Sequence, residues 1–173
     1  DVLYGTYNPS GKLPFTYPRY SGTLITYDHK LLDEAVEIVE PEYNYFYEFN
    51  PQYPFGHGLS YTTFEYGKII MNTDTLAIND SLRISVKVTN TGKVAGQEVI
   101  ELYTHDLVAS ITPCVKRLRK FEKINLIPGE TKSVDFVLTK RDLAFVNEAL
   151  KTVTEKGIFE IMISNQKALV YYK

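Results

Sequence analysis

The stretch that decides the fold class is LRISVKVTN, residues 82–90. Its apolar residues alternate strictly with polar ones: Leu82, Ile84, Val86 and Val88. A period of two residues is typical of a β-strand that buries one face and exposes the other. The four residues 90–93, NTGK, have turn chemistry, so the sequence predicts that the strand ends there.

Six further stretches with strand character are predicted at about residues 64–71, 97–104, 115–124, 133–138, 157–163 and 168–172. Turns separate them, such as Ile127-Pro-Gly-Glu130, where Pro followed by Gly suits the centre of a type II turn. Residues 141–145 are predicted to form a short helical turn. Seven alternating strands in about 110 residues indicate a mainly β fold, an immunoglobulin-like or fibronectin type III-like sandwich.

The first 60 residues show no self-contained core. Pro14 and Pro18 exclude a central strand between them, and residues 31–39 carry the apolar stripe of a short helix. Ten aromatic residues lie between Tyr43 and Tyr66. Aromatic rings are rigid and amphipathic, so this density predicts either a buried anchoring segment or a sugar-stacking surface.

Charge and composition exclude several classes of partner. The net charge is −2, from 19 basic and 21 acidic residues, which argues against nucleic acid and against an anionic membrane surface. No stretch approaches the roughly 20 apolar residues that a membrane span needs. Cys114 is the only cysteine, so no intramolecular disulfide can form, and we expect a structural role for it. The start has neither a signal peptide nor an initiator Met, which suggests a longer polypeptide.

Several phrases resemble one family in the expected order. Residues 1–14, DVLYGTYNPSGKLP, resemble the end of the α/β sandwich domain of glycoside hydrolase family 3. Residues 53–64, YPFGHGLSYTTF, look like the linker into that family's fibronectin type III-like domain. Four later phrases are similar to that third domain: residues 88–92, 94–99, 126–131 and 142–145. The chain departs from the common family pattern at residues 112–115 and at Ala149-Leu150, where relatives often have Arg-Pro-Val and an aromatic residue.

The resemblance implies a domain division and a function. Residues 1–30 would be the tail of the α/β sandwich domain, 31–62 the linker, and 63–173 the fibronectin type III-like domain. The family mostly hydrolyses β-linked glucosides or xylosides with retention, which needs two carboxyl groups about 5–5.5 Å apart. In the family both precede the region that this chain resembles, so we expect the chain to be inactive alone.

The expected role is therefore that of the C-terminal part of a β-glycosidase, in particular a β-glucosidase that hydrolyses O-glycosyl bonds in carbohydrate metabolism. This part would stabilise and orient its partners, the catalytic barrel and α/β sandwich domains, which act on a β-linked oligosaccharide or glucoside. We expect no cofactor, and a periplasmic or secreted location is favoured over a cytoplasmic one. The alternatives are a free-standing carbohydrate-binding module and a structural adhesion-type sandwich.

Two histidines are predicted to reach the rim of the substrate site. His57 lies between two glycines in an aromatic loop, and His29 follows a segment that lies near the domain interfaces in intact relatives. For His57, packing at the domain junction is the alternative. The three histidines are too dispersed for metal-ligand spacing, so no metal site is expected. The close pairs Glu34/Glu37 and Glu40/Glu42 are interpreted as a solvated acidic face.

Overall fold

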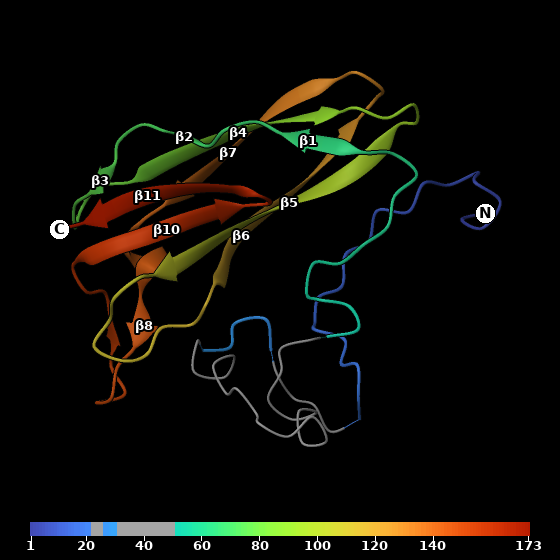
Figure 1. Cartoon of the computed structure of the whole chain (residues 1–173). Coiled ribbons are helices and arrows are strands. Elements are labelled where there is room, and N and C mark those ends of the chain that lie inside the picture. Colours follow the sequence, from blue (N-terminus) through green and yellow to red (C-terminus); the bar gives the residue numbers. More distant parts are fainter. Residues whose placement is uncertain (22–25, 31–50) are drawn as a thin grey trace.

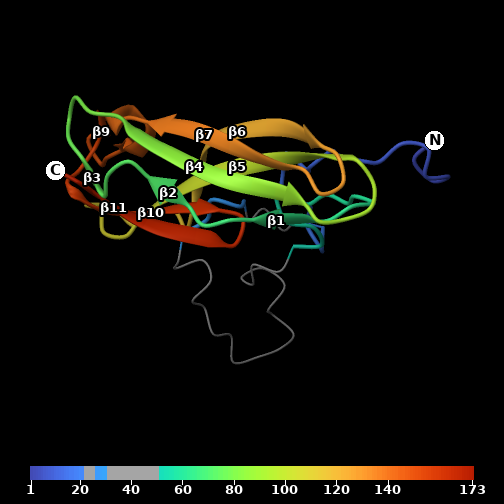
Figure 2. The ribbon, with the colours of Figure 1, turned by 90° about the horizontal axis from the view of Figure 1, so that it is seen from above.

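A computed structural model describes residues 1–21, 26–30 and 51–173, and it shows two β-sheets packed face to face (Figures 1 and 2). The first sheet contains β1 (Phe64–Tyr66), β2 (Ile70–Met71), β4 (Leu82–Asn90) and β7 (Thr131–Leu138). The second has the order β3 (Thr75–Leu76), β11 (Gln166–Tyr172), β10 (Gly157–Ile163), β5 (Gly96–Asp106) and β6 (Arg117–Leu126). The predicted mainly β sandwich is confirmed.

All seven predicted strands are present, and the first is divided. β1 and β2 both pair antiparallel with β4, but three residues lie between Tyr66 and Ile70 where only two lie between their partners Val88 and Ser85. One extra residue of this kind is a bulge, which interrupts the ladder and bends the strand. The predicted helical turn is the 3₁₀ helix η2 (Lys140–Leu143). Sequence periodicity missed the two-residue strands β3, β8 (Phe145–Val146) and β9 (Thr152–Val153).

The core lies between the sheets, where the predicted alternation becomes alternating burial. Along β4 every second residue is buried, from Leu82 to Asn90, and the strand pairs with β7 from Leu82↔Leu138 to Thr89↔Thr131. β10 and β11 contribute the next large group of core side chains, among them Phe159, Ile161, Ile163, Val170 and Tyr172. Burying one large apolar side chain contributes roughly 1.5–3 kcal/mol, so this interface is what stabilises the sandwich.

The described residues that precede β1 form what we call the N-terminal segment: 1–21, 26–30 and 51–62. Lys12 contacts Glu98 of β5, and the Val115 N–H in the loop before β6 donates to the His29 carbonyl, whereas the bonds between Tyr17 and Tyr53 lie within the segment itself. The predicted helix at 31–39, the aromatics Tyr43–Phe49 and the paired glutamates at 34–42 lie outside the described residues. The part of the chain that is described contains no helix able to cross a membrane.

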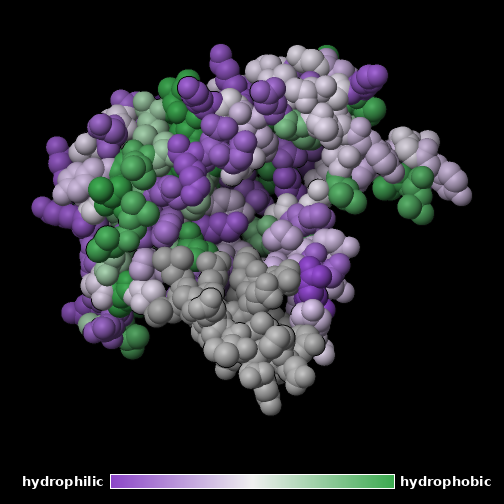
Figure 3. Space-filling view, viewed as in Figure 1, coloured by the Kyte–Doolittle hydropathy of each residue, from purple (hydrophilic) through white to green (hydrophobic). Residues whose placement is uncertain are grey.

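The outer face of the five-stranded sheet is covered unevenly. At the β5 end, Tyr103 is buried under Tyr27 and Phe55 of the N-terminal segment. At the other end, Ile158 of β10 and Leu169 of β11 are about half exposed, and apolar surface gathers over this part of the molecule (Figure 3). The N-terminal segment therefore meets the sandwich along one side only.

Candidate functional site

The candidate site is the contact between the N-terminal segment and β5, which we call the seam. β10 pairs with β5 only from Leu102 to Asp106, so the other half of that edge of β5 is open to other contacts. There Lys12 of the N-terminal segment places its ammonium 2.7 Å from Oε1 of Glu98, and Tyr66 of β1 donates its hydroxyl to the same oxygen at 2.7 Å. One carboxylate thus joins the N-terminal segment to both sheets.

The environment of this carboxylate raises the pKa of the Tyr66 hydroxyl. Glu98 is 9% exposed. Burial, followed by the negative charge of Glu98 and the hydrogen bond to it, raises the pKa of Tyr66 well above its usual value of 10. Tyr66 is therefore a permanent hydrogen-bond donor at physiological pH. Hydrogen bonds that involve a charged group contribute about 1.5–3 kcal/mol, roughly twice a neutral one.

A second polar cluster fixes the C-terminal end of the N-terminal segment, residues 60–62. The side-chain oxygen of Asn8 accepts from the Ser60 hydroxyl at 3.0 Å and from the Tyr61 N–H at 2.8 Å, and its amide donates to the Ala95 carbonyl at 2.9 Å. Two residues on, the Thr62 hydroxyl donates to Asn90 at 2.6 Å. Asn8 and Asn90 together attach residues 60–62 to the turn between β4 and β5.

Two glycines make this close approach possible. A Cβ at Gly92 would lie 2.2 Å from the Thr62 hydroxyl oxygen, and one at Gly96 would lie 2.7 Å from the Thr62 methyl and 2.8 Å from the Asn8 amide. Real side chains do not tolerate such distances. Both glycines belong to the phrases that resemble the family. Because they have no side chain, residues 60–62 can lie against the turn.

Aromatic rings form the third part of the seam. Tyr27 stacks on Phe55 with ring centroids 4.3 Å apart and meets Tyr103 edge-on at 6.1 Å. The Lys116 ammonium lies 4.9 Å from the centre of the Tyr103 ring. Aromatic pairs of this kind contribute about 0.5–1.5 kcal/mol beyond area burial. For Phe55, the contacts favour anchoring over sugar stacking.

Both predicted histidines belong to the N-terminal segment. The His57 ring stacks on Tyr53 at 4.8 Å, and its carbonyl accepts the Leu13 N–H at 2.9 Å. His29 is buried, and its Nδ1 lies 3.0 Å from the Thr26 carbonyl oxygen. These contacts account for packing of both side chains. A role at the substrate rim stays a prediction.

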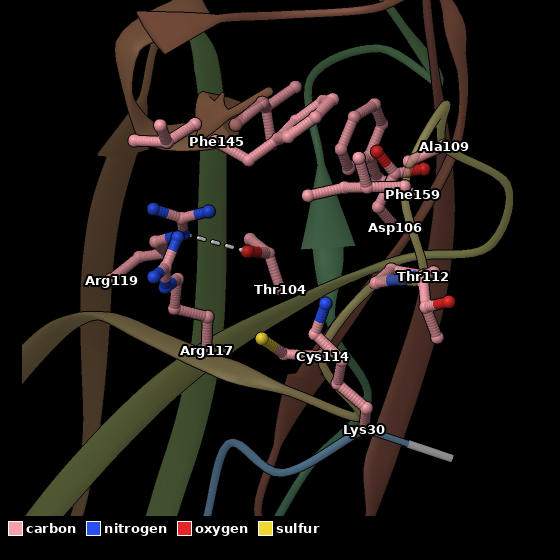
Figure 4. A pocket seen from close by; sticks show the side chains of 14 residues that line it. Lys30, Thr104, Asp106, Ala109, Thr112, Cys114, Arg117, Arg119, Phe145 and Phe159 are labelled. Carbon is pink, nitrogen blue, oxygen red and sulfur yellow. Dashed lines mark hydrogen bonds between the residues drawn. The ribbon is translucent and has the colours of Figure 1, made fainter. Parts of the chain in front are cut away.

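Two cavities of about 230 Å³ each lie near this region. One is in the seam and is lined by Lys12, Phe55, Tyr66, Glu98, Glu101 and Tyr103, among others. The other is at the end of the sandwich, beneath the loop between β5 and β6, and contains Cys114 and Lys30 at its rim (Figure 4). Among residues 1–21, 26–30 and 51–173, no group of three or more His, Cys, Asp or Glu could hold a metal ion.

Asp106 at the end of β5 gives a pH prediction. Its Oδ2 is buried without a hydrogen-bond partner among the described residues, while Oδ1 accepts the Val108 N–H at 3.2 Å. Burial, with a further contribution from Glu155, raises the pKa of the Asp106 carboxyl to about 6. The folded state therefore binds the proton more tightly than the unfolded state between about pH 4 and 6, and this group's contribution to the free energy of unfolding falls as pH rises through that window.

We expect Asp106→Asn to remove this dependence. Because the side chain is partly exposed, solvent screening reduces the effect, and the variant should gain about 1 kcal/mol over the wild type between pH 4 and pH 7.5. Urea denaturation at both pH values measures the difference. Asp135→Asn, on the exposed face of β7, is the control and should give a constant difference. Equal pH dependence in wild type and Asp106→Asn would contradict the prediction.

Comparison with known proteins identifies the class. Residues 1–61 match the family described as glycosyl hydrolase family 3 C-terminal domain, and residues 98–167 match the fibronectin type III-like domain. The chain is similar to the periplasmic beta-glucosidase of Salmonella typhimurium, with 42% identity over 98% of this chain and 23% of that protein. It is also similar to a beta-xylosidase of Formosa agariphila, with 41% identity over 94% of this chain and 22% of the relative.

Solved structures that resemble this chain include two β-glucosidases. A β-glucosidase from Erythrobacter marinus superposes with a TM-score of 0.88 at 38% identity, over 99% of this chain and 23% of that one. The β-glucosidase of Listeria innocua in complex with glucose gives a TM-score of 0.87 at 33% identity, over 99% and 25%. The molecule is thus a fibronectin type III-like sandwich joined to a segment of a hydrolase domain. Its N-terminal part matches the C-terminal domain of glycosyl hydrolase family 3, and the whole chain spans about a quarter of the length of these relatives.

Proposed function

We propose that this chain is the C-terminal part of a retaining β-glucosidase, in which the sandwich stabilises and orients the catalytic domains. The observation that carries the proposal is the ion pair of Lys12 with Glu98, extended by Tyr66. Lys12 lies in the region that matches the family's C-terminal domain, and Glu98 lies in the sandwich. A hydrolase domain that includes residues 1–61 would therefore be held in one orientation relative to the sandwich.

The hydrogen bonds of the carboxylates in the seam support the proposal that the chain alone is inactive. A retaining enzyme needs two carboxyl groups on opposite sides of the sugar, with a bound substrate between them. In the seam cavity, Glu98 accepts from both Lys12 and Tyr66, and Glu101 accepts from Tyr103 at 2.7 Å. These glutamates are engaged in structural hydrogen bonds. The proposed catalytic carboxylates belong to the barrel and α/β sandwich domains.

The finer points of the proposal concern substrate and boundaries. Several similar proteins are called β-glucosidases and others β-xylosidases, and we propose a β-glucoside or a β-linked oligosaccharide as substrate. The proposed division is the tail of the α/β domain at 1–30, a linker at 31–62 and the sandwich domain at 63–173. Within it, His29 and His57 are proposed to contribute to the rim of the substrate site.

A chimera tests the proposal. The C-terminal quarter of the Salmonella periplasmic β-glucosidase that aligns with this chain is replaced by residues 1–173. We expect the chimera to hydrolyse aryl β-glucosides, whereas the host enzyme without that quarter should lose at least about 100-fold in kcat/KM, because misplacement by about 1 Å can cost that much. An aryl β-xyloside, assayed in parallel, tests the substrate preference.

Two results would contradict the proposal. One is turnover of aryl β-glucosides by the isolated chain in proportion to its purity, which would assign it catalytic groups of its own. The other is a truncated host as active as the chimera, which would mean that the sandwich does not orient the catalytic domains. A free-standing carbohydrate-binding module would instead release heat on titration with cello- or xylo-oligosaccharides in calorimetry.

A further inference from the structure

The cavity at the end of the sandwich is separate from the seam and has a different chemical character (Figure 4). Its floor is formed by buried residues of the core, namely Thr104, Leu143 and Phe159, which are at most 3% exposed. Phe145 of β8 and Ile111 of the loop add further apolar wall. The cavity volume is about 230 Å³, which is below the roughly 300–1,000 Å³ of drug-sized ligand sites. A molecule with a single ring fits this size.

Two arginines from β6 lie beside each other on one side of this cavity (Figure 4). Arg119 donates from Nε to the Thr104 hydroxyl at 2.9 Å and from Nη2 to the Ala144 carbonyl at 3.4 Å. Burial and the positive charge of Arg117 lower the pKa of the Arg119 guanidinium. Two like charges are therefore held close together in a half-buried site.

No acidic side chain within the described ranges forms a hydrogen bond or an ion pair with either of these two arginines. The Arg117 side chain makes no hydrogen bond or ion pair with the described residues, although its backbone pairs with Thr104 of β5. Asp142, the acidic residue whose charge acts on Arg119, is itself paired with Lys120 at 2.9 Å and accepts from Thr139. Guanidinium groups recognise carboxylates in a planar, two-point geometry. The arginine side of the cavity is therefore suited to an anion.

The opposite side of the cavity carries a buried acceptor that lacks a hydrogen-bond donor. Figure 4 shows Asp106 across the cavity from the two arginines, next to Phe159. The Oδ2 of Asp106 is a buried acceptor that has no donor within the described part of the chain. An unsatisfied buried acceptor is unfavourable, and a ligand hydroxyl would supply the missing donor.

We propose that this cavity binds a small hydroxylated aromatic carboxylate, with its anion on Arg117 and Arg119 and its hydroxyl toward Asp106. The ring would lie on the apolar floor between the two polar ends. This proposal is independent of the proposed glycosidase function. It concerns a site in the sandwich itself, so the isolated chain is sufficient to test it.

The probe is 4-hydroxycinnamate, titrated into the isotope-labelled chain at pH 7.5 and followed by amide chemical shifts. We expect saturable shifts at Thr104, Phe145 and Val146 with a Kd on the order of 1 mM, which is normal for a ligand of about 12 heavy atoms. The neutral amide of the same acid should bind at least about tenfold more weakly, because it loses the charge-assisted contacts. Unsubstituted cinnamate should bind about threefold more weakly, because it lacks the hydroxyl.

Matched variants localise the contact. Arg117→Gln removes a guanidinium that makes no bond to the described residues. It should lower the affinity for 4-hydroxycinnamate about tenfold. Arg83→Gln, an equal charge change on the other sheet, should leave the affinity unchanged. Asp106→Ala should abolish the preference for 4-hydroxycinnamate over cinnamate.

Three results would overturn the proposal. They are the absence of saturable shifts at the cavity amides up to about 10 mM probe, equal affinity for acid and amide, and an Arg117→Gln affinity equal to that of Arg83→Gln. The comparison of acid with amide uses the wild-type chain, so a variant that fails to fold would not prevent the test. None of these results bears on the chimera experiment, so the two proposals can fail separately.

Discussion

Asn90→Ala should lower the free energy of unfolding by about 3–5 kcal/mol, which is among the largest effects expected of a single polar substitution. Asn90 is fully buried and uses every hydrogen-bonding position of its amide. Its oxygen accepts from the Thr62 hydroxyl at 2.6 Å and from the Gly92 N–H at 3.0 Å. Its nitrogen donates to the Val94 carbonyl at 2.9 Å and to the Leu126 carbonyl at 3.0 Å. Alanine would leave the Thr62 hydroxyl and the Leu126 carbonyl buried and unsatisfied.

Urea denaturation at pH 7 measures the loss. Asn79→Ala, an exposed asparagine in the turn before β4, is the matched control and should change stability by less than about 0.5 kcal/mol. Thr62→Val removes one of the four bonds at almost constant volume, and we expect about 1–2 kcal/mol from it. An Asn90→Ala variant no less stable than Thr62→Val would show that the four bonds do not act as one network.

The same residue shows how far sequence reasoning extends. The alternation of residues 82–90 predicted β4 because one face of the strand is buried along its whole length, so every side chain follows the pattern. The sequence predicts that Asn90 begins a turn, since Asn, Thr and Gly favour turns. Its burial could not be inferred, because it depends on Thr62 and Leu126, which are 28 and 36 residues away.

The short strands and the seam were beyond sequence periodicity for a related reason. β3 has two residues, and it exists because it pairs in parallel with the end of β11 about a hundred residues later. Lys12 and Glu98 are 86 residues apart, and although both lie in phrases that resemble the family, nothing local indicates that they pair. The phrases around Gly92 and Gly96 did mark the region, although only the structure shows that Thr62 and Asn8 need the space.

Lys12→Met should release the N-terminal segment from the sandwich without unfolding it. The substitution keeps the aliphatic stem and removes the ammonium that lies 2.7 Å from Glu98, in a pair whose side chains are 25% and 12% exposed. Two backbone bonds within the N-terminal segment, next to Lys12, report the loosening that follows release: the Leu13 N–H donates to the His57 carbonyl, and the Gly56 N–H donates to the Leu13 carbonyl. Their amide exchange should become about tenfold faster, whereas that of the core residue Val86 should not change.

The control is Lys167→Met, which removes an equivalent pair with Glu160 on the same sheet. That lysine side chain is 64% exposed, so solvent already screens the pair and the loss should not be measurable. Glu98→Ala should go further than Lys12→Met, with a loss of about 2–3 kcal/mol in unfolding, because Tyr66 then also loses its acceptor.

Amide exchange and stability, compared across these variants, decide which contacts hold the N-terminal segment against the sandwich. If Glu98→Ala destabilises the sandwich while Lys12→Met leaves the exchange of Leu13 unchanged, Glu98 serves only to join the two sheets through Tyr66. The N-terminal segment would then be held by Asn8 and the stacked rings of Tyr27 and Phe55 alone. Faster exchange at Leu13 in both variants, with Val86 unaffected by Lys12→Met, is the result that the proposed orienting role requires. In the chimera, Lys12→Met should then lower kcat/KM more than Lys167→Met does.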